Sequence, residues 1–143
     1  YDVTRLKKAY NDFLLISNRF KGSKYANDAE NRLVFLRNSM ANHEVYIAKY
    51  YLKRGAFIAS SERAKYMLET YPGAPASRDA LIILINSYNK LGTTNLAIET
   101  AKVLAGNFSN YSYSVDKDNL VVIKDNSVDT TVEESSFFDF GLF

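Results

Sequence analysis

The chain has 143 residues, of which 47% are hydrophobic and 24% charged, and its formal net charge is +2. This length suits one compact domain or a short array of repeats, and the apolar fraction excludes a chain that is disordered throughout. The absence of Cys excludes disulfides and thiolate metal sites, and a single His argues against a site built from several histidines.

Two features bear on membranes and targeting. No apolar run approaches the roughly 20 residues that a membrane-spanning helix needs, and we find no secretory signal. Because Tyr1 is not an initiator residue, we expect the sequence to be a trimmed fragment.

Charge is distributed unevenly along the chain. Residues 1–106 carry 16 Lys/Arg and 9 Asp/Glu, a net charge of +7, whereas residues 107–143 carry 2 Lys and 7 Asp/Glu, a net charge of −5. The basic residues are scattered at helix-surface spacing without a dense cluster, which argues against nucleic-acid binding. Two interpretations stay open. In one, the acidic tail docks back on the basic body; in the other, the basic body faces an acidic partner.

The first two segments have helical periodicity. Residues 4–20 place apolar side chains on one face, and Lys21-Gly22-Ser23 then reads as a loop. From about residue 25 to 54 there is no Gly or Pro, so we expect one long helix that bridges two repeats. Its predicted apolar stripe, widened by Val34 and Phe35, consists of Ala29, Leu33, Leu36, Met40, His43, Ile47 and Tyr50. We expect His43 to have a structural role.

Three shorter helices are predicted next, over residues 56–71, 75–92 and 94–107. The first ends before Pro72, the second is expected to begin at Pro75, and Thr94 is the expected N-cap of the third. The expected inward-facing residues are Ile58 or Ala59, Ala64, Met67, Leu68 and Tyr71, then Ala80, Leu81, Leu84, Ile85, Tyr88 and Leu91, then Ala97, Ala101, Val103 and Leu104.

Two pairs of residues give the chain an internal register. Tyr51 and Tyr88 are 37 residues apart, as are Gly55 and Gly92. A tetratricopeptide repeat has about 34 residues, so the extra three are placed around residues 73–75. The sequence predicts an all-α fold of tetratricopeptide-like helical hairpin repeats over residues 1–107, with about five helices, one of them long and bridging.

Residues 108–143 form an acidic, aromatic-rich extension that lacks helical periodicity. One interpretation is a short β-hairpin, with strands at 120–123 and 128–132 and a turn at 124–127. The other is an irregular, wrapped or flexible tail. The closing FFDFGLF is strongly apolar, so we expect it to pack on the helical body, on a partner or on a membrane surface.

No catalytic motif is found along the chain. A glycine-rich phosphate loop, a zinc-binding helix motif and a nucleophile elbow are all missing from the sequence. Acidic neighbours such as Asp28 with Glu30 and Glu133 with Glu134 read as solvated charges. The sequence therefore indicates a scaffold that needs no cofactor.

Several runs resemble a known family. They are RLVFLRN at 32–38, E-x₃-A-x-YY-x-KRGA at 44–56, R-x₃-ML-x₂-YP at 63–72, SRDAL at 77–81 and the SY-x-KLG turn at 87–92. Over about residues 5–107 the chain resembles the C-terminal repeats of the BamD family, the tetratricopeptide lipoproteins of the outer-membrane β-barrel assembly machinery. The KRGA and R-x₃-ML-x₂-YP runs carry most of this resemblance.

The resemblance implies a place and a set of partners. Members lie at the periplasmic face of the outer membrane of Gram-negative bacteria, held by an N-terminal lipid anchor that is absent from this chain. The implied partners are the periplasmic POTRA domain of a BamA-like barrel subunit, other assembly lipoproteins and unfolded outer-membrane proteins. The implied function is non-enzymatic, as a scaffold that aids insertion of β-barrel proteins.

The family position used to contact the barrel subunit maps to Arg63, whose guanidinium pairs well with a carboxylate. Glu62, Tyr66, Arg54 and Phe57 complete the expected partner-binding surface. The structural alternative for Arg63 is a surface ion pair with Glu62 or Glu69. The functional alternative for the chain is a generic tetratricopeptide adaptor that binds peptide segments, and a lipobox cysteine upstream would discriminate against it.

Overall fold

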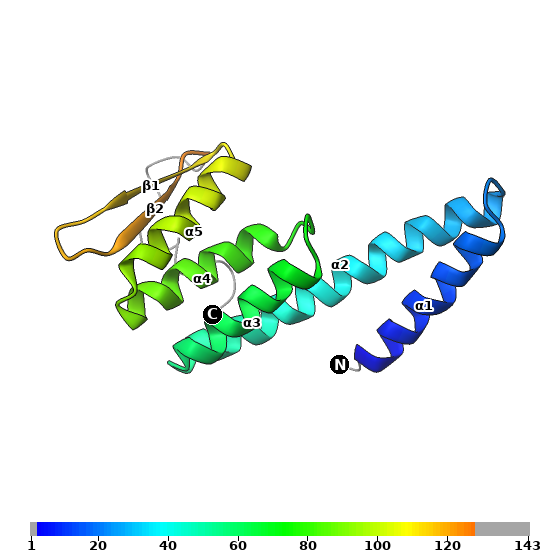
Figure 1. Cartoon of the computed structure of the whole chain (residues 1–143), viewed down its shortest axis with the longest axis horizontal. Helices are drawn as coiled ribbons and strands as arrows, with labels where there is room; N and C mark the ends of the chain where they lie inside the picture. Colours follow the sequence, from blue (N-terminus) through cyan, green and yellow to red (C-terminus); the bar gives the residue numbers. More distant parts are fainter. Residues whose placement is uncertain (1–2, 128–143) are drawn as a thin grey trace.

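The computed structural model describes residues 3–127, which form five helices followed by a two-stranded antiparallel sheet. The helices are α1 (Val3–Arg19), α2 (Lys24–Lys53), α3 (Phe57–Thr70), α4 (Ser77–Leu91) and α5 (Thr94–Asn107), and the strands are β1 (Tyr111–Val115) and β2 (Val121–Asp125). Each helix packs against the next one along the chain. The expected array of helical hairpins is therefore confirmed, and α1 and the first half of α2 extend as an arm from the remaining elements (Figure 1).

Helix α2 is the expected long helix, and it does bridge two hairpins, because it packs against α1, α3 and also α4. It begins after Ser23, whose hydroxyl accepts the backbone N–H of Ala26 at 3.2 Å as an N-cap. Of the expected stripe, Ala29, Leu36 and Met40 are buried.

The far end of the predicted stripe is wrong, since Tyr50 is 48% exposed and Ala41, Val45 and Ala48 are buried instead. A stripe repeating every 3.5 residues drifts around a helix of 3.6 residues per turn, so its last members leave the packed face. Val34 and Phe35 do not widen that face, because they are exposed on the arm, where α1 alone lies alongside α2 (Figure 1).

The core lies around α4, which is covered by α3 on one side, by α5 on the other and by α2. Six consecutive α4 residues, from Ala80 to Ile85, are buried, as expected for a helix that has neighbours all round. The inner residue near the start of α3 is Ala59, since Ile58 is exposed. Leu91 and Val103 were expected to face inward but are exposed, Leu91 because it is the last residue of α4; we have no packing explanation for Val103.

The predicted register of the repeats is confirmed at the two helix ends that Gly55 and Gly92 follow. Their φ angles are +78° and +75°. After Gly55, the N–H of Ala56 bonds the carbonyl of Tyr51 at 2.9 Å; after Gly92, the N–H of Thr93 bonds the carbonyl of Tyr88 at 3.0 Å. The same hydrogen bond therefore recurs 37 residues later. It requires a residue in the left-handed backbone conformation, which glycine adopts without strain.

The predicted helix start at Pro75 and the predicted N-cap at Thr94 are both wrong. Pro75 lies in a turn closed by the N–H of Ser77 and the carbonyl of Ala74 at 2.9 Å, and α4 begins at Ser77. Proline favours the second position of such a turn, which explains why the helix starts after it. The N-cap of α5 is Thr93, and the hydroxyl of Thr94 instead donates to the carbonyl of Asn119 at 3.1 Å.

The extension does form a β-hairpin, but the predicted bounds are wrong, because Lys124 and Asp125 of the expected turn at 124–127 belong to the second strand. β2 overlaps the expected strand at 120–123, and its partner is β1, which precedes it, with Tyr113 opposite Ile123. The alternation in YSYSV places Tyr111 and Tyr113 on the face that packs against the core. The expected strand at 128–132 and the terminal FFDFGLF lie outside the described residues.

The turn between the strands and the open end of the hairpin are both held by aspartates. Asp116 accepts the N–H groups of Asp118 and Leu120 through Oδ1, at 2.8 and 2.9 Å. At the other end, burial by itself raises the pKa of Asp125, but hydrogen bonds from Ser127 and Asn110 outweigh burial and hold that pKa below its ordinary value. These contacts order a hairpin whose sequence has no Asn-Gly turn.

The β-hairpin is attached to the helices mainly by the Asn89 side chain of α4 and by the packing of its strands against α5. Asn89, near the end of α4, donates through Nδ2 to the carbonyl of Val121 at 2.9 Å and accepts the N–H of Val121 through Oδ1 at 3.0 Å. This amide therefore pairs with the backbone as a neighbouring strand would. Both strands also pack against α5, so the hairpin covers the side of α5 that faces away from α4 (Figure 1).

Replacing Gly55 by Ala should destabilise the fold by about 1–2 kcal/mol, because a side chain strains a left-handed residue even in open space. Gly106 is the matched control. It lies within α5 with equally open space around it, and Gly106→Ala should stabilise by about 0.5–1 kcal/mol. Urea denaturation followed by circular dichroism measures both, and effects of the same sign would contradict the assigned turn.

Replacing Asn89 by Ala should lower the free energy of unfolding by about 1–3 kcal/mol, since both backbone groups of Val121 lose a half-buried partner. Amide hydrogen exchange over 111–125 should become faster. The control is Asn107→Ala, which removes an exposed amide that donates to the Val103 carbonyl of its own helix. Its free energy of unfolding should change by less than about 0.5 kcal/mol. Unchanged exchange in Asn89→Ala would show that α5 alone holds the hairpin.

Candidate functional site

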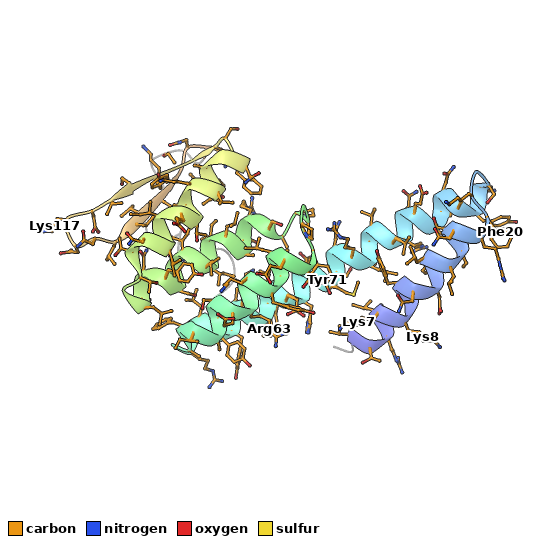
Figure 2. All side chains as sticks on the ribbon, viewed as in Figure 1. Lys7, Lys8, Phe20, Arg63, Tyr71 and Lys117 are labelled. Atoms are coloured by element: carbon orange, nitrogen blue, oxygen red, sulfur yellow. The ribbon has the colours of Figure 1, made fainter. Side chains whose placement is uncertain are left out.

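The five residues expected to bind a partner all belong to the α2–α3 hairpin. Arg63, Glu62 and Tyr66 lie on α3, Phe57 is its first residue and Arg54 is the C-cap of α2. Figure 2 labels Arg63 on α3, far from Lys117 at the tip of the β-hairpin. Arg63 and Tyr66 are brought together, since the guanidinium carbon lies 6.0 Å from the centroid of the tyrosine ring.

Arg54 and Phe57 are not in this contact. The guanidinium carbon of Arg54 lies 4.9 Å from the ring centroid of Tyr50, and Tyr50 in turn makes an edge contact with Tyr51 at 5.8 Å. Phe57 is half-buried. The hairpin thus carries two separate arginine–tyrosine pairs, one on α3 and one at the end of α2.

Arg63 forms an ion pair, but with a residue that the sequence prediction missed. Its Nη1 donates to Oε2 of Glu44 on α2 at 3.0 Å. The predicted pair with Glu62 or Glu69 is wrong. Glu62 is adjacent in sequence and so points about a quarter-turn away, and its carboxylate lies 3.6 Å from Lys65 instead.

The two ion pairs differ in burial and therefore in energetic weight. The Glu44 side chain is 9% exposed and that of Arg63 is 38% exposed, whereas Glu62 and Lys65 are 69% and 44% exposed. An exposed pair contributes little, because water and salt screen it. A nearly buried carboxylate depends on its partner, since removing the partner leaves a desolvated charge. The Arg63–Glu44 pair is therefore the one that matters for the surface of this hairpin.

The sequence does contain a signal that Glu44 is buried and needs a charged partner. Glu44 lies among Met40, Ala41, Val45 and Ala48, which are apolar and spaced to share one helix face. A charged residue on an otherwise apolar face is rarely buried without a partner. In a helical hairpin the second helix packs against the apolar face of the first, so a basic partner on α3 was the residue to search for.

No group of three or more His, Cys, Asp or Glu side chains is positioned to hold a metal ion within residues 3–127. His43 is half-buried and engaged in an interaction within the molecule. Burial lowers the pKa of Lys49, with the charge of Asp79 on α4 opposing that effect.

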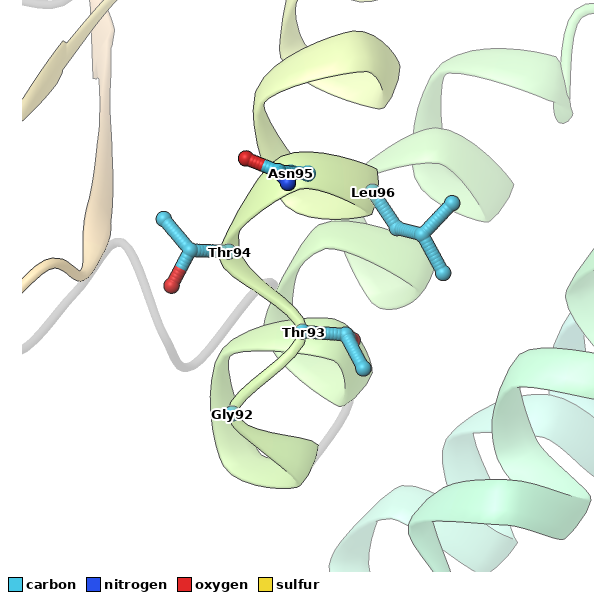
Figure 3. Close-up of a pocket in the computed structure, with 5 residues that line it drawn as sticks. All are labelled: Gly92, Thr93, Thr94, Asn95 and Leu96. Atoms are coloured by element: carbon cyan, nitrogen blue, oxygen red, sulfur yellow. The ribbon is translucent and has the colours of Figure 1, made fainter.

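An open pocket lies at the turn between α4 and α5, lined by Gly92, Thr93, Thr94, Asn95 and Leu96. Figure 3 shows Thr94 pointing towards the hairpin and Leu96 pointing the opposite way. None of the five side chains titrates in the ordinary pH range, so the pocket offers no group for proton transfer. Of the helices that the structure describes, none has the length and apolarity to cross a membrane.

Comparison with known proteins gives one family. The family model YfiO, described as outer membrane lipoprotein, matches residues 1–104, which end three residues before the end of α5 and before the hairpin. The chain is similar to proteins named outer membrane protein assembly factor BamD. The identity is 40% with that of Xylella fastidiosa (strain Temecula1 / ATCC 700964), covering 74% of this chain and 36% of the relative.

Two further relatives carry the same name. The protein of Neisseria meningitidis (strain DSM 15465 / Z2491) is 40% identical over 71% of this chain and 38% of its own length, and that of Haemophilus influenzae (strain ATCC 51907 / DSM 11121 / KW20 / Rd) is 32% identical over 82% and 45%. The chain thus spans less than half the length of these relatives. The resemblance inferred from the KRGA and R-x₃-ML-x₂-YP runs is confirmed, and the chain belongs to the YfiO/BamD family of outer-membrane lipoproteins.

Proposed function

We propose that this chain is a docking scaffold in outer-membrane protein assembly, and that its α2–α3 hairpin binds the periplasmic POTRA region of a BamA-like barrel subunit. Family membership supports a location at the periplasmic face of the outer membrane. The names of the relatives support a role in assembly. The mechanism is binding, with rigid helical hairpins holding a partner.

The observation that carries this proposal is the setting of Arg63. Its side chain is 38% exposed, it is fixed to Glu44 and it lies beside the 41% exposed Tyr66. Arginine and tyrosine dominate the energetics of protein interfaces, because both bury a large area and keep a polar group for specific contacts. An acidic side chain on the partner is the group that Arg63 would recognise.

The remaining partners concern the full length of the relatives, of which this chain covers less than half. We extend to them the same proposal: contacts with other assembly lipoproteins and with unfolded outer-membrane proteins, and attachment to the membrane through an N-terminal lipid. The helical repeats over residues 1–107 would supply the docking unit, and the extension over 108–143 is proposed as a separate part.

Reversing the charge of Arg63 should weaken docking. We expect Arg63→Glu to weaken binding of the chain to the POTRA domains from the same organism by at least about tenfold, and Arg63→Lys to weaken it less, because lysine keeps the charge but not the planar fork. Lys65→Glu is the matched control, as it makes the same charge change two residues away on α3. Titration calorimetry measures all three. Equal losses of affinity for Arg63→Glu and Lys65→Glu would show that binding depends on the overall charge of α3 and not on a specific contact of Arg63.

Loss of the ion pair should also be visible in the free chain. Arg63→Met keeps an apolar stem but leaves Glu44 unpaired, so the free energy of unfolding should fall by about 1–2 kcal/mol, less than for a fully buried pair because Arg63 is partly solvated. Lys65→Met removes only the exposed pair with Glu62 and should change stability by less than about 0.5 kcal/mol. Urea denaturation compares them, and indistinguishable values would show that the Glu44 carboxylate is better solvated than its exposure indicates.

A further inference from the structure

Glu44 is the one nearly buried carboxylate that we find among residues 3–127, since it is the only acidic residue there in the buried class. Its position in the middle of α2 places it against α3, at the base of the surface that carries Arg63 and Tyr66. Neighbouring positions of the same face are filled by the buried apolar side chains of Ala41, Val45 and Ala48.

We propose that Glu44 is a positioning residue for docking: it holds the Arg63 guanidinium in a fixed orientation so that the free N–H groups of Arg63 are presented to a carboxylate of the partner. This inference rests on the proposed docking role of Arg63. It assigns the specificity of the hairpin to a side chain that the partner itself need not touch.

The hydrogen-bond geometry leaves Arg63 able to bind a second acidic group. A guanidinium has five N–H donors in a rigid fork, and the hydrogen bond from Nη1 to Glu44 is the one that its side chain makes within residues 3–127. The ring of Tyr66, 6.0 Å from the guanidinium carbon, restrains it from another side. Nε and Nη2 remain for a partner carboxylate, with the orientation already set.

A competing interpretation makes Glu44 a latch that the partner carboxylate must displace. Burial argues against it, because displacement would leave the 9% exposed Glu44 side chain charged and unpaired. That penalty is several kcal/mol for a buried charge, and the partner would gain nothing to offset it. Retention of the pair and addition of a second carboxylate avoids this penalty. The two interpretations predict opposite signs when Glu44 is neutralised.

The test measures the dissociation constant of the full chain for the POTRA domains of the same organism, with Glu44→Gln and Glu44→Met. Gln keeps a weak acceptor and Met keeps none, and neither leaves a buried charge. We expect Glu44→Met to weaken binding by about three- to tenfold and Glu44→Gln by less, because Arg63 must then lose its rotamer freedom at the moment of binding. Unchanged or tighter binding by both variants would overturn the proposal, and tighter binding would support the latch.

One control variant separates positioning from stability. Ser60→Ala removes a buried hydrogen bond from Ser60 Oγ to the carbonyl of Ala48 at 2.7 Å across the same two helices, so it perturbs the α2–α3 contact without touching Arg63. It should lower the melting temperature and leave binding unchanged. A loss of binding in Ser60→Ala equal to that in Glu44→Met would assign the effect to the helix contact and overturn the proposal.

A double-mutant cycle identifies the residue through which Glu44 acts. If Glu44 works by orienting Arg63, Glu44→Met should have no further effect on binding in an Arg63→Met background. Additive losses would overturn the positioning role. If Arg63→Met alone leaves binding unchanged, the proposed docking site itself fails; if Arg63→Met weakens binding and Glu44→Met does not, only the positioning role fails.

Discussion

The close approach of α2 and α3 is the constraint on which the rest of the structure depends. Small side chains on both helices, those of Ala41 and Ala48 of α2 and of Ser60 and Ala64 of α3, are fully buried. Small side chains let two helices pack at short range, and the Ser60 hydroxyl then reaches a carbonyl of α2 at 2.7 Å. Helix α4 packs against both of these helices and α5 packs against α4, so the later elements are built on this contact.

At the C-terminal end of the helical array, the exposed face of α5 must be covered. The last helix of a repeat array exposes a face that a following repeat would cover. Here the β-hairpin covers α5, and the Asn89 amide joins its second strand to α4 by two hydrogen bonds. The match to the family ends at residue 104, so this closing element lies beyond the matched region although it is packed against it.

The proposed docking surface uses the same α2–α3 contact for another purpose. Because the two helices are held so closely, the Glu44 side chain is nearly buried and has Arg63 as its ion-pair partner. Arg63 is therefore both part of the hairpin and available at its surface. Its second restraint, Tyr66, lies one turn further along α3. A charge placed in this way has a defined direction, which a lone surface arginine lacks.

The sequence by itself determined the helices and their register, because uninterrupted helical periodicity and the glycines at 55 and 92 are local properties of the chain. The runs around Arg63 also identified the family. Only the tertiary structure decided that Arg63 pairs with Glu44, that Asn89 holds the hairpin and that the strand at 121–125 pairs with the one before it. The two side-chain contacts join residues 19 and 32 positions apart, and the strand pairing joins residues 6 to 14 apart. Local patterns carry little information about which of these groups burial will bring together.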